Sequence, residues 1–94
     1  MALFGLTSFQ RDLLYVITGM SKSSGQEIKE ELAEEFGEIT HGRLYPNLDT
    51  LVEKGYVKKG KIDRRSNYYE ITQYGKTQLR RRRQWEDNYV PFDE

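Results

Sequence analysis

The sequence contains no cysteine, only one histidine and no long apolar run. The lack of cysteine excludes disulfides, thiolate zinc sites and thiol redox sensing. No apolar stretch approaches the ~20 residues that a membrane-spanning helix needs, and the chain does not open with a signal-peptide pattern. We therefore expect a soluble, cytoplasmic protein that does not interact with membranes.

Groups suited to covalent catalysis are equally scarce. His41 is the single histidine, no serine stands in a nucleophile motif, and no glycine-rich phosphate loop is present. The acidic residues between positions 27 and 35 are spaced to line a polar helix face, which does not cage a cation. The sequence therefore predicts a protein that is not an enzyme and that uses no metal and no cofactor.

The length of the chain, 94 residues, is that of one domain, which we assign to residues 1–94. A chain this short buries only roughly 60–65% of the surface that it exposes when unfolded, so its stability alone is marginal. Dimerisation would be a simple way to bury more surface.

The charges are unevenly distributed, although the formal net charge is zero. Residues 1–40 carry three basic and seven acidic side chains, residues 41–83 carry twelve basic and four acidic ones, and residues 84–94 carry four acidic ones and no basic one. A basic block inside a small neutral domain indicates an anionic partner for one surface. The alternative is a solvated face whose charges pair within the molecule.

Apolar residues at spacings of three and four predict helices in the first half of the chain. The first helix begins near Thr7 and ends before the SKSSG turn at residues 21–25. The second begins near Ser24, and Gly37 is its expected stop. Residues 38–40 are too few for a helix and could form a single bridge of strand.

The third helix is expected over about residues 42–54, after which the period changes. Residues 56–62 and 67–72 read as two strands with turn-forming residues between them. A polar fourth helix follows over about residues 73–90. This order predicts a winged helix-turn-helix, mainly α with a small β-hairpin (α+β), whose core covers about residues 6–72. In such a fold the third helix enters the DNA major groove and the hairpin lies as a wing over the backbone.

Pro46 stands near the start of the third helix. The first N–H groups of a helix have no internal partner, so the missing N–H of a proline costs least there. A proline in the first turn places the start of the helix near Gly42 or Arg43. Thr40 is an alternative N-cap, and a start there would put Pro46 deeper and kink the helix. The sequence leaves both registers open.

The leucines of the third helix define its buried side, so the opposite side is free to meet DNA. Arg43 can bond a guanine edge and Asn47 an adenine edge, each discriminating by roughly 1–3 kcal/mol. Tyr45 can donate to a phosphate, but Tyr45 and Pro46 could instead only pack against the second helix. His41 is expected to meet solvent or the backbone, and a DNA phosphate otherwise. The candidate DNA-binding residues here are Thr40, His41, Gly42, Arg43, Tyr45, Pro46, Asn47 and Thr50.

The hairpin concentrates five cations: Lys58, Lys59, Lys61, Arg64 and Arg65. Contacts between such cations and phosphates position a protein on DNA, carry little sequence information, and weaken steeply with salt. The tip, with Arg64 and Arg65, could enter a minor groove, and an ordinary solvated hairpin is the alternative. The candidate wing residues are Lys59, Lys61, Arg64, Arg65, Asn67 and Tyr68. We expect the outward side of residues 42–50 and the loop after Ile62 to form one continuous surface that attracts anions.

The segments GRLYPNLDTLVEKGYV and DRRSNYYEITQYG together resemble the PadR-like transcriptional regulators. The matching positions are Tyr45, Pro46, Leu48, Leu51 and Gly55 in the recognition helix, and Tyr69, Thr72 and Gly75 after the wing. The resemblance covers about residues 6–90 and is greatest to the short members of halophilic archaea. It implies a homodimeric regulator, usually a repressor, that binds a palindromic operator in double-stranded DNA.

The resemblance also implies that the last helix is a dimerisation helix that meets the N-terminal segment of the partner. The candidate interface residues are Leu3, Phe4, Leu6, Phe9, Leu79, Trp85, Tyr89 and Val90. Four arginines, residues 80–83, are unusual in such a helix and could face solvent, pair with acidic residues or extend the DNA footprint.

Two other functions remain open. The wing of a winged helix can dock on an acidic protein partner, which would make the chain an interaction module. Some PadR-like proteins bind flat aromatic molecules through a tryptophan of the last helix, so the resemblance also allows a small-molecule effector near Trp85. The simpler interpretation is that Trp85 packs in the dimer.

Overall fold

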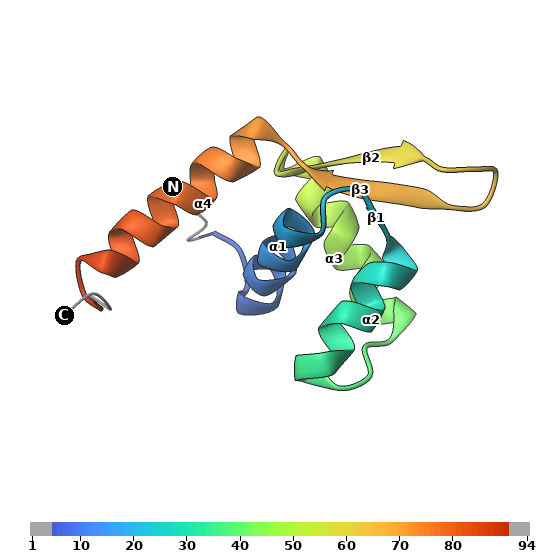
Figure 1. Cartoon of the computed structure of the whole chain (residues 1–94), viewed down its shortest axis with the longest axis horizontal. Coiled ribbons are helices and arrows are strands. Elements are labelled where there is room, and N and C mark those ends of the chain that lie inside the picture. The colour runs from blue at the N-terminus through green and yellow to red at the C-terminus, as the bar shows by residue number, and fades with distance from the viewer. Residues whose placement is uncertain (1–4, 91–94) are drawn as a thin grey trace.

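The structure, a computed structural model, describes residues 5–90 and confirms the predicted order of elements (Figure 1). Three helices form the body: α1 (Ser8–Met20), α2 (Gly25–Phe36) and α3 (His41–Glu53). The hairpin consists of β2 (Val57–Lys61) and β3 (Asn67–Ile71), and α4 (Gln73–Asp87) follows it. A two-residue strand, β1 (Ser23–Ser24), completes an antiparallel sheet with the order β1-β3-β2.

Each of the four helices begins after a serine or threonine whose side chain accepts the backbone N–H group three residues further on. These N-caps are Thr7, Ser24, Thr40 and Thr72. In α1 and α2 a glutamine or glutamate at that third position bonds back to the N–H of the cap, which satisfies a second donor. The helix starts are therefore fixed locally, by short-range hydrogen bonds.

The core lies where the apolar faces of α1, α2 and α3 meet the inner face of the hairpin. Fully burying a large apolar side chain contributes roughly 1.5–3 kcal/mol. Side chains that are at most 2% exposed come from every one of these elements and from the α2–α3 loop: Leu13, Leu14, Ile17, Ile28, Leu32, Ile39, Leu44, Leu48, Leu51, Val57 and Tyr69.

The short third strand lies elsewhere than the sequence suggests. The sequence allowed a single bridge of strand at residues 38–40, but residues 37–40 form no strand, and Ile39 is buried in the core. The strand lies instead in the expected turn before α2, where Ser23 pairs with Tyr69. A strand of two residues has no alternation by which its sequence could identify it.

The start of α3 settles the register around Pro46. The helix begins at His41 with Thr40 as its N-cap, so of the two starts that the sequence left open, the structure has the earlier one and not the one near Gly42 or Arg43. The Thr40 hydroxyl accepts the N–H of Arg43 at 3.2 Å, which favours the earlier start. Pro46 is consequently the sixth helical residue and has no N–H to give to the carbonyl of Gly42, four residues back.

The residues that follow α3 are hydrogen-bonded to Thr72, the N-cap of α4. Gly55 has a φ of +83° and donates to the Val52 carbonyl, and Tyr56 donates to the Leu51 carbonyl, which is the pattern of a Schellman cap. The Thr72 hydroxyl donates to the Gly55 carbonyl at 2.7 Å. These bonds fix where α4 leaves the sheet.

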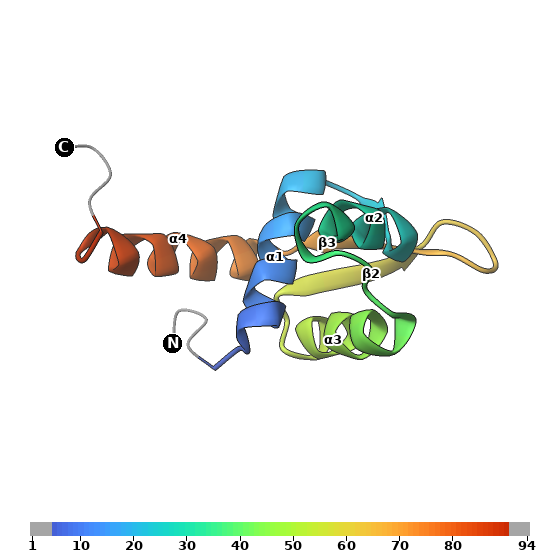
Figure 2. The same ribbon diagram turned by 90° about the horizontal axis from the view of Figure 1, so that it is seen from below.

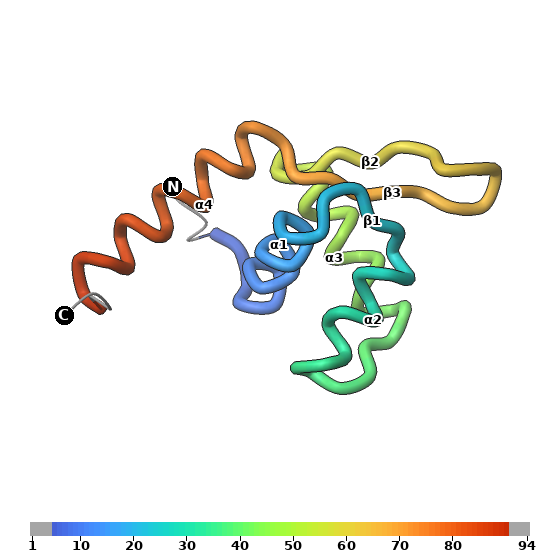
Figure 3. The backbone as a smooth tube through the Cα atoms, in the orientation of Figure 1, coloured from blue at the N-terminus to red at the C-terminus, as the bar shows by residue number. Residues whose placement is uncertain are grey.

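The hairpin and α4 leave the three-helix body in opposite directions, as Figures 2 and 3 show. The helix α3 packs against β2 of the wing, whereas α4 extends away from the wing tip. The molecule thus has a compact central body and two projections on opposite sides of it.

Candidate nucleic-acid interface

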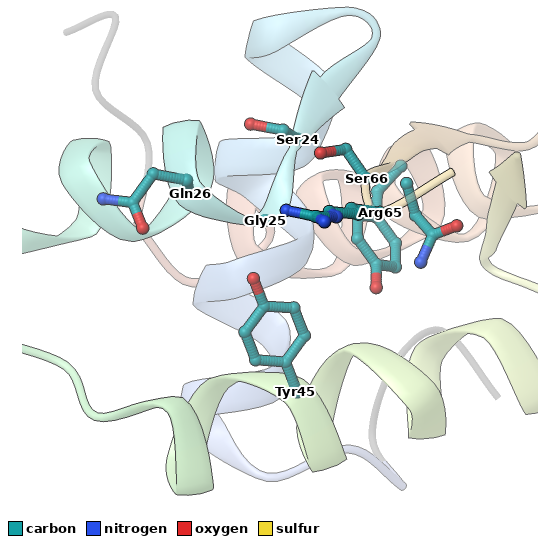
Figure 4. A pocket seen from close by; sticks show the side chains of 8 residues that line it. Ser24, Gly25, Gln26, Tyr45, Arg65 and Ser66 are labelled. Carbon is teal, nitrogen blue, oxygen red and sulfur yellow. The ribbon is translucent and has the colours of Figure 1, made fainter. Parts of the chain in front are cut away.

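Three elements meet at one pocket of about 150 Å³: the start of α2, the first half of α3 and the tip of the wing (Figure 4). The lining residues are Ser24, Gly25, Gln26, Tyr45, Arg65, Ser66, Asn67 and Tyr69. Tyr45 of α3 and Arg65 of the wing thus face the same space. The continuous surface expected from the outward side of residues 42–50 and the loop after Ile62 stays a prediction, which this shared pocket supports.

Tyr45 packs against the first residue of α2. A Cβ added at Gly25 would lie 2.7 Å from Cε1 of the Tyr45 ring, so the ring occupies the space that a side chain would need. Figure 4 shows the Tyr45 hydroxyl pointing from α3 toward Gly25. The ring also lies 5.3 Å from the ring of His41. Tyr45 therefore packs against the second helix, as one of the two alternatives had it, and its contact with a phosphate stays a prediction.

The two candidate base-reading side chains lean toward α1. The guanidinium carbon of Arg43 lies 4.0 Å from the centre of the Phe9 ring. The Asn47 amide accepts a bond from Gln10 Nε2 at 3.0 Å and donates to the Arg43 carbonyl at 2.6 Å. Asn47 therefore keeps one amide hydrogen and one oxygen lone pair for another partner. Sequence reasoning did not identify the contact of Gln10, because its partner Asn47 lies 37 residues away along the chain.

The remaining candidates on α3 lie on its exposed side. Thr40, His41, Gly42 and Pro46 are exposed, and Thr50 is half-buried with its hydroxyl donating to the Pro46 carbonyl at 3.1 Å. Gly42 and Pro46 carry no side-chain donor. How closely the exposed side of α3 can approach a DNA groove therefore depends on the helix backbone and on the proline ring.

The wing tip is organised by one carboxylate. Asp63 Oδ1 accepts the N–H groups of Arg65 and Ser66 at 2.8 and 2.9 Å, and the Ile62 N–H donates to the Ser66 carbonyl at 2.9 Å. These bonds close the predicted hairpin turn. Arg64 and Arg65 are exposed.

Part of the positive charge of the wing is paired within the molecule. Lys58 Nζ lies 3.3 Å from a carboxylate oxygen of Glu70, and Lys59 Nζ lies 3.9 Å from one of Asp49. Over the described residues 5–90, Lys61, Arg64 and Arg65 form no ion pair. Internal pairing thus accounts for two of the five wing cations, and three remain available for an outside anion.

The register of the hairpin decides which wing residues face α3. Directly opposed residues of antiparallel strands share a face. Lys59 opposes Tyr69, which is buried against the body, and Lys61 opposes Asn67 two residues along. These side chains therefore share the inner face. Tyr68 lies on the opposite face, where its ring covers Gly60, and its contact with DNA stays a prediction.

Asp49 lies where the wing meets the recognition helix, a position that sequence reasoning did not assign. Burial raises the pKa of Tyr69, and the nearby negative charge of Asp49 raises that pKa further. Asp49 is therefore close both to the buried tyrosine and to Lys59. The carboxylate of Asp49 therefore lies beside the cations of the wing.

The candidate dimer residues fall into three groups. Leu3 and Phe4 lie outside the described residues. Leu6, Phe9 and Leu79 are at most 9% exposed and belong to the core of the single chain, so their burial needs no partner. The exposed candidates are Trp85, Tyr89 and Val90, at 41, 69 and 49%. Their place in a dimer stays a prediction.

The arginine run of α4 is divided by the helix. Arg80, Arg81 and Arg83 are exposed. The side chain of Arg82 is only 12% exposed, bonds Glu86 at 3.2 Å and lies over the Trp85 ring. Two of the expected alternatives, solvent exposure and pairing with an acidic residue, therefore both occur.

Two further observations concern residues 5–90 alone. Within them no helix is long and apolar enough to cross a membrane. In the same part of the chain, histidine and acidic side chains form no group that could hold a metal ion.

Comparison with known proteins gives a consistent result. The model of the transcriptional regulator PadR-like family matches residues 13–81. RosR of H. salinarum is 41% identical over 98% of this chain and 84% of its own, with a TM-score of 0.88. A MarR mutant of E. coli in complex with operator DNA is 26% identical over 85% of this chain and 55% of its own, with a TM-score of 0.74.

The fold is shared more widely. FabT of Streptococcus pneumoniae in complex with DNA is 20% identical over 89% of this chain and 57% of its own, with a TM-score of 0.71. At that identity the likeness concerns the fold alone. No curated protein sequence matches the chain significantly.

Proposed function

Because the chain belongs to the transcriptional regulator PadR-like family, it is a DNA-binding transcription regulator and not an enzyme, and we propose that it represses transcription as a homodimer on a palindromic operator. The single observation that carries the interface is the pocket shared by Tyr45 and Arg65. It brings the recognition helix and the wing to one surface. The MarR complex with operator DNA, which has the same fold, supports this use of the surface.

On this surface α3 lies in the major groove and the wing lies on the backbone or in a minor groove. Arg43 and Asn47 are the base-contacting residues, and Lys61, Arg64 and Arg65 contact phosphates. The three wing cations suit this role, because they are exposed and, within residues 5–90, have no ion-pair partner. Their release of counterions would make DNA affinity fall steeply with salt.

The second projection, α4, is the proposed dimer contact. Trp85, Tyr89 and Val90 expose apolar surface on and just after this helix. An apolar surface of this kind at one end of a small domain favours burial against another chain. Two-fold symmetry of the dimer would then appear in the operator as two half-sites about one helical turn apart, roughly 34–36 Å.

Selection from randomised duplex DNA, read at two salt concentrations, tests these points together. A two-fold symmetric motif with strong salt dependence is the expected result. A single asymmetric half-site would contradict the homodimer, and the absence of any retained duplex at low salt would contradict DNA binding. Transcription from a promoter that carries the selected motif, with and without the protein, then tests repression.

A pair of charge reversals tests the wing. Arg64→Glu with Arg65→Glu should abolish retention of DNA, since it places two negative charges at the backbone contact. Arg80→Glu with Arg81→Glu changes the net charge equally on the helix that leaves the body away from the wing, and should retain binding. Unchanged binding of the wing variant would favour a wing that docks on a protein partner.

Two single substitutions separate base contacts from phosphate contacts. Arg43→Ala should relax sequence preference at one position of each half-site, with a loss of roughly 1–3 kcal/mol in discrimination. Lys61→Ala should weaken binding to all sequences about equally and flatten the salt slope by about one unit. If both variants lowered affinity uniformly, α3 would not be reading bases through Arg43.

A further inference from the structure

The side chain of Gln10 connects the start of α1 to the recognition helix. Gln10 Oε1 accepts the backbone N–H of Thr7 at 3.1 Å, and Gln10 Nε2 donates to Asn47 Oδ1 at 3.0 Å. Asn47 Nδ2 in turn donates to the backbone carbonyl of Arg43 at 2.6 Å. A series of three hydrogen bonds therefore runs from the backbone N–H of Thr7, the N-cap of α1, to a backbone carbonyl in α3.

The backbone groups at the two ends of this series of hydrogen bonds determine which atom donates in each bond. A backbone N–H can only donate, so the Gln10 atom that faces Thr7 must be the oxygen, and the Gln10 atom that faces Asn47 must be the nitrogen. The Arg43 carbonyl can only accept, so the Asn47 atom that faces it must be the nitrogen. Turning either amide over would set two donors or two acceptors against each other. Each amide therefore has a single orientation that satisfies its neighbours.

This orientation matters for reading a base. An asparagine recognises adenine with its oxygen accepting from N6 and its nitrogen donating to N7. After the internal bonds, Asn47 has one lone pair and one amide hydrogen left, which is the number that this contact requires. An amide that could turn over would also present the opposite pattern, which would weaken the preference for adenine.

We propose that Gln10 is a positioning residue for DNA recognition, which holds the Asn47 amide in the orientation that reads adenine. This proposal rests on the proposed DNA-binding function and assigns to the N-terminal turn of α1 a role in the specificity of α3. Phe9, one residue before Gln10, lies under the Arg43 guanidinium, so the same turn supports both candidate base-reading side chains.

Gln10→Glu isolates the positioning role from the capping role. Glutamate serves the capping box as well as glutamine does, so the bond to the Thr7 N–H and the helix start are kept. The carboxylate cannot donate to Asn47 Oδ1, however, and would instead attract Asn47 Nδ2 away from the Arg43 carbonyl. The variant therefore changes the Asn47 amide while it leaves α1 intact.

The experiment compares selection profiles of the full chain and of four variants: Asn47→Ala, Gln10→Glu, the double variant and Ser8→Glu. Asn47→Ala should remove an adenine preference of about 5- to 150-fold at one position of each half-site. Gln10→Glu should reduce the preference at that same position by at least about fivefold, and should add nothing in the Asn47→Ala background. Ser8→Glu adds the same charge to the exposed first residue of α1 and should change no base preference.

Thermal unfolding of each variant accompanies the profiles, and Gln10→Glu should unfold near the temperature of the native chain. If Asn47→Ala altered the preference and Gln10→Glu did not, the positioning role would be refuted while DNA reading by Asn47 stood. If Asn47→Ala altered no position, the proposal would fail although the protein still bound DNA. Loss of all retention by the native chain would instead refute the proposed function.

Discussion

Replacement of Pro46 by alanine should make the protein more stable. Pro46 is the sixth residue of α3, where a proline leaves the Gly42 carbonyl without its helical donor and crowds that carbonyl with its ring. Pro46 is exposed, so alanine gives up little packing. The substitution restores a backbone N–H inside a helix that already continues to Glu53.

The expected gain follows from two opposing terms. Proline in a helix interior is about 3 kcal/mol less favourable than alanine. Proline also restricts the unfolded chain, which is worth about 0.4–1 kcal/mol and is lost in the variant. The free energy of unfolding should therefore rise by about 2 kcal/mol for Pro46→Ala. For a domain of this size each kcal/mol shifts the midpoint by about 4–8 °C, so the midpoint should rise by about 8–16 °C.

Thermal and urea unfolding followed by far-ultraviolet circular dichroism measure this gain. Pro46→Gly is the matched control, because glycine restores the same N–H but is about 1 kcal/mol less favourable than alanine in a helix. It should therefore lie below the alanine variant by about that amount. A Pro46→Ala protein no more stable than the native chain would show that α3 accommodates the proline without strain, and would refute this reasoning.

Three further predictions concern the charge junction, the seat of α4 and the buried tyrosine. Asp49→Asn should free Lys59, whose Nζ lies 3.9 Å from the Asp49 carboxylate, and should steepen the salt slope of DNA binding by about one unit. Adding Lys59→Gln to that variant should reverse the change. An unchanged salt slope would show that the Lys59–Asp49 ion pair does not compete with phosphate. Gly75→Ala should lower the free energy of unfolding by about 1–3 kcal/mol, since the added methyl group would overlap a backbone carbonyl. Gly19→Ala has open space around the added methyl group and should raise the free energy of unfolding by up to about 1 kcal/mol in the same denaturant titration. Because burial raises the pKa of Tyr69, its neutral form stabilises the fold at neutral pH, and that stability is lost as pH rises through the alkaline range above about 10. In Tyr69→Phe the urea midpoint should therefore decline less with rising pH than in the native chain. An equal decline in both proteins would contradict this prediction.

Much of the fold could be predicted because its signals are local. The N-caps Thr7 and Ser24, the leucine spacing of α3 and the change of period after Gly55 each depend on residues within a few positions of one another. Pro46 shows the limit of such reasoning. Two helix starts were locally acceptable, and the bond between the Thr40 hydroxyl and the Arg43 N–H favours the earlier one.

The site was predicted less completely, because its side chains are held by distant partners. Asn47 was correctly placed on the recognition helix, but the bond that orients it comes from Gln10, 37 residues away. Lys59 was recognised as a wing cation, but its pairing with Asp49 depends on how the hairpin lies over α3. No spacing in the sequence encodes either contact.

The sequence by itself determined the order of elements, the family and the basic character of the wing, because periodicity, capping residues and charge are properties of neighbouring residues. The tertiary structure alone decided which of those charges and amides are available to a partner. It pairs two wing lysines internally, leaves Arg64 and Arg65 exposed, and ties Asn47 to α1. Availability is decided by packing, since a side chain can meet an outside partner only where the fold has not already supplied one.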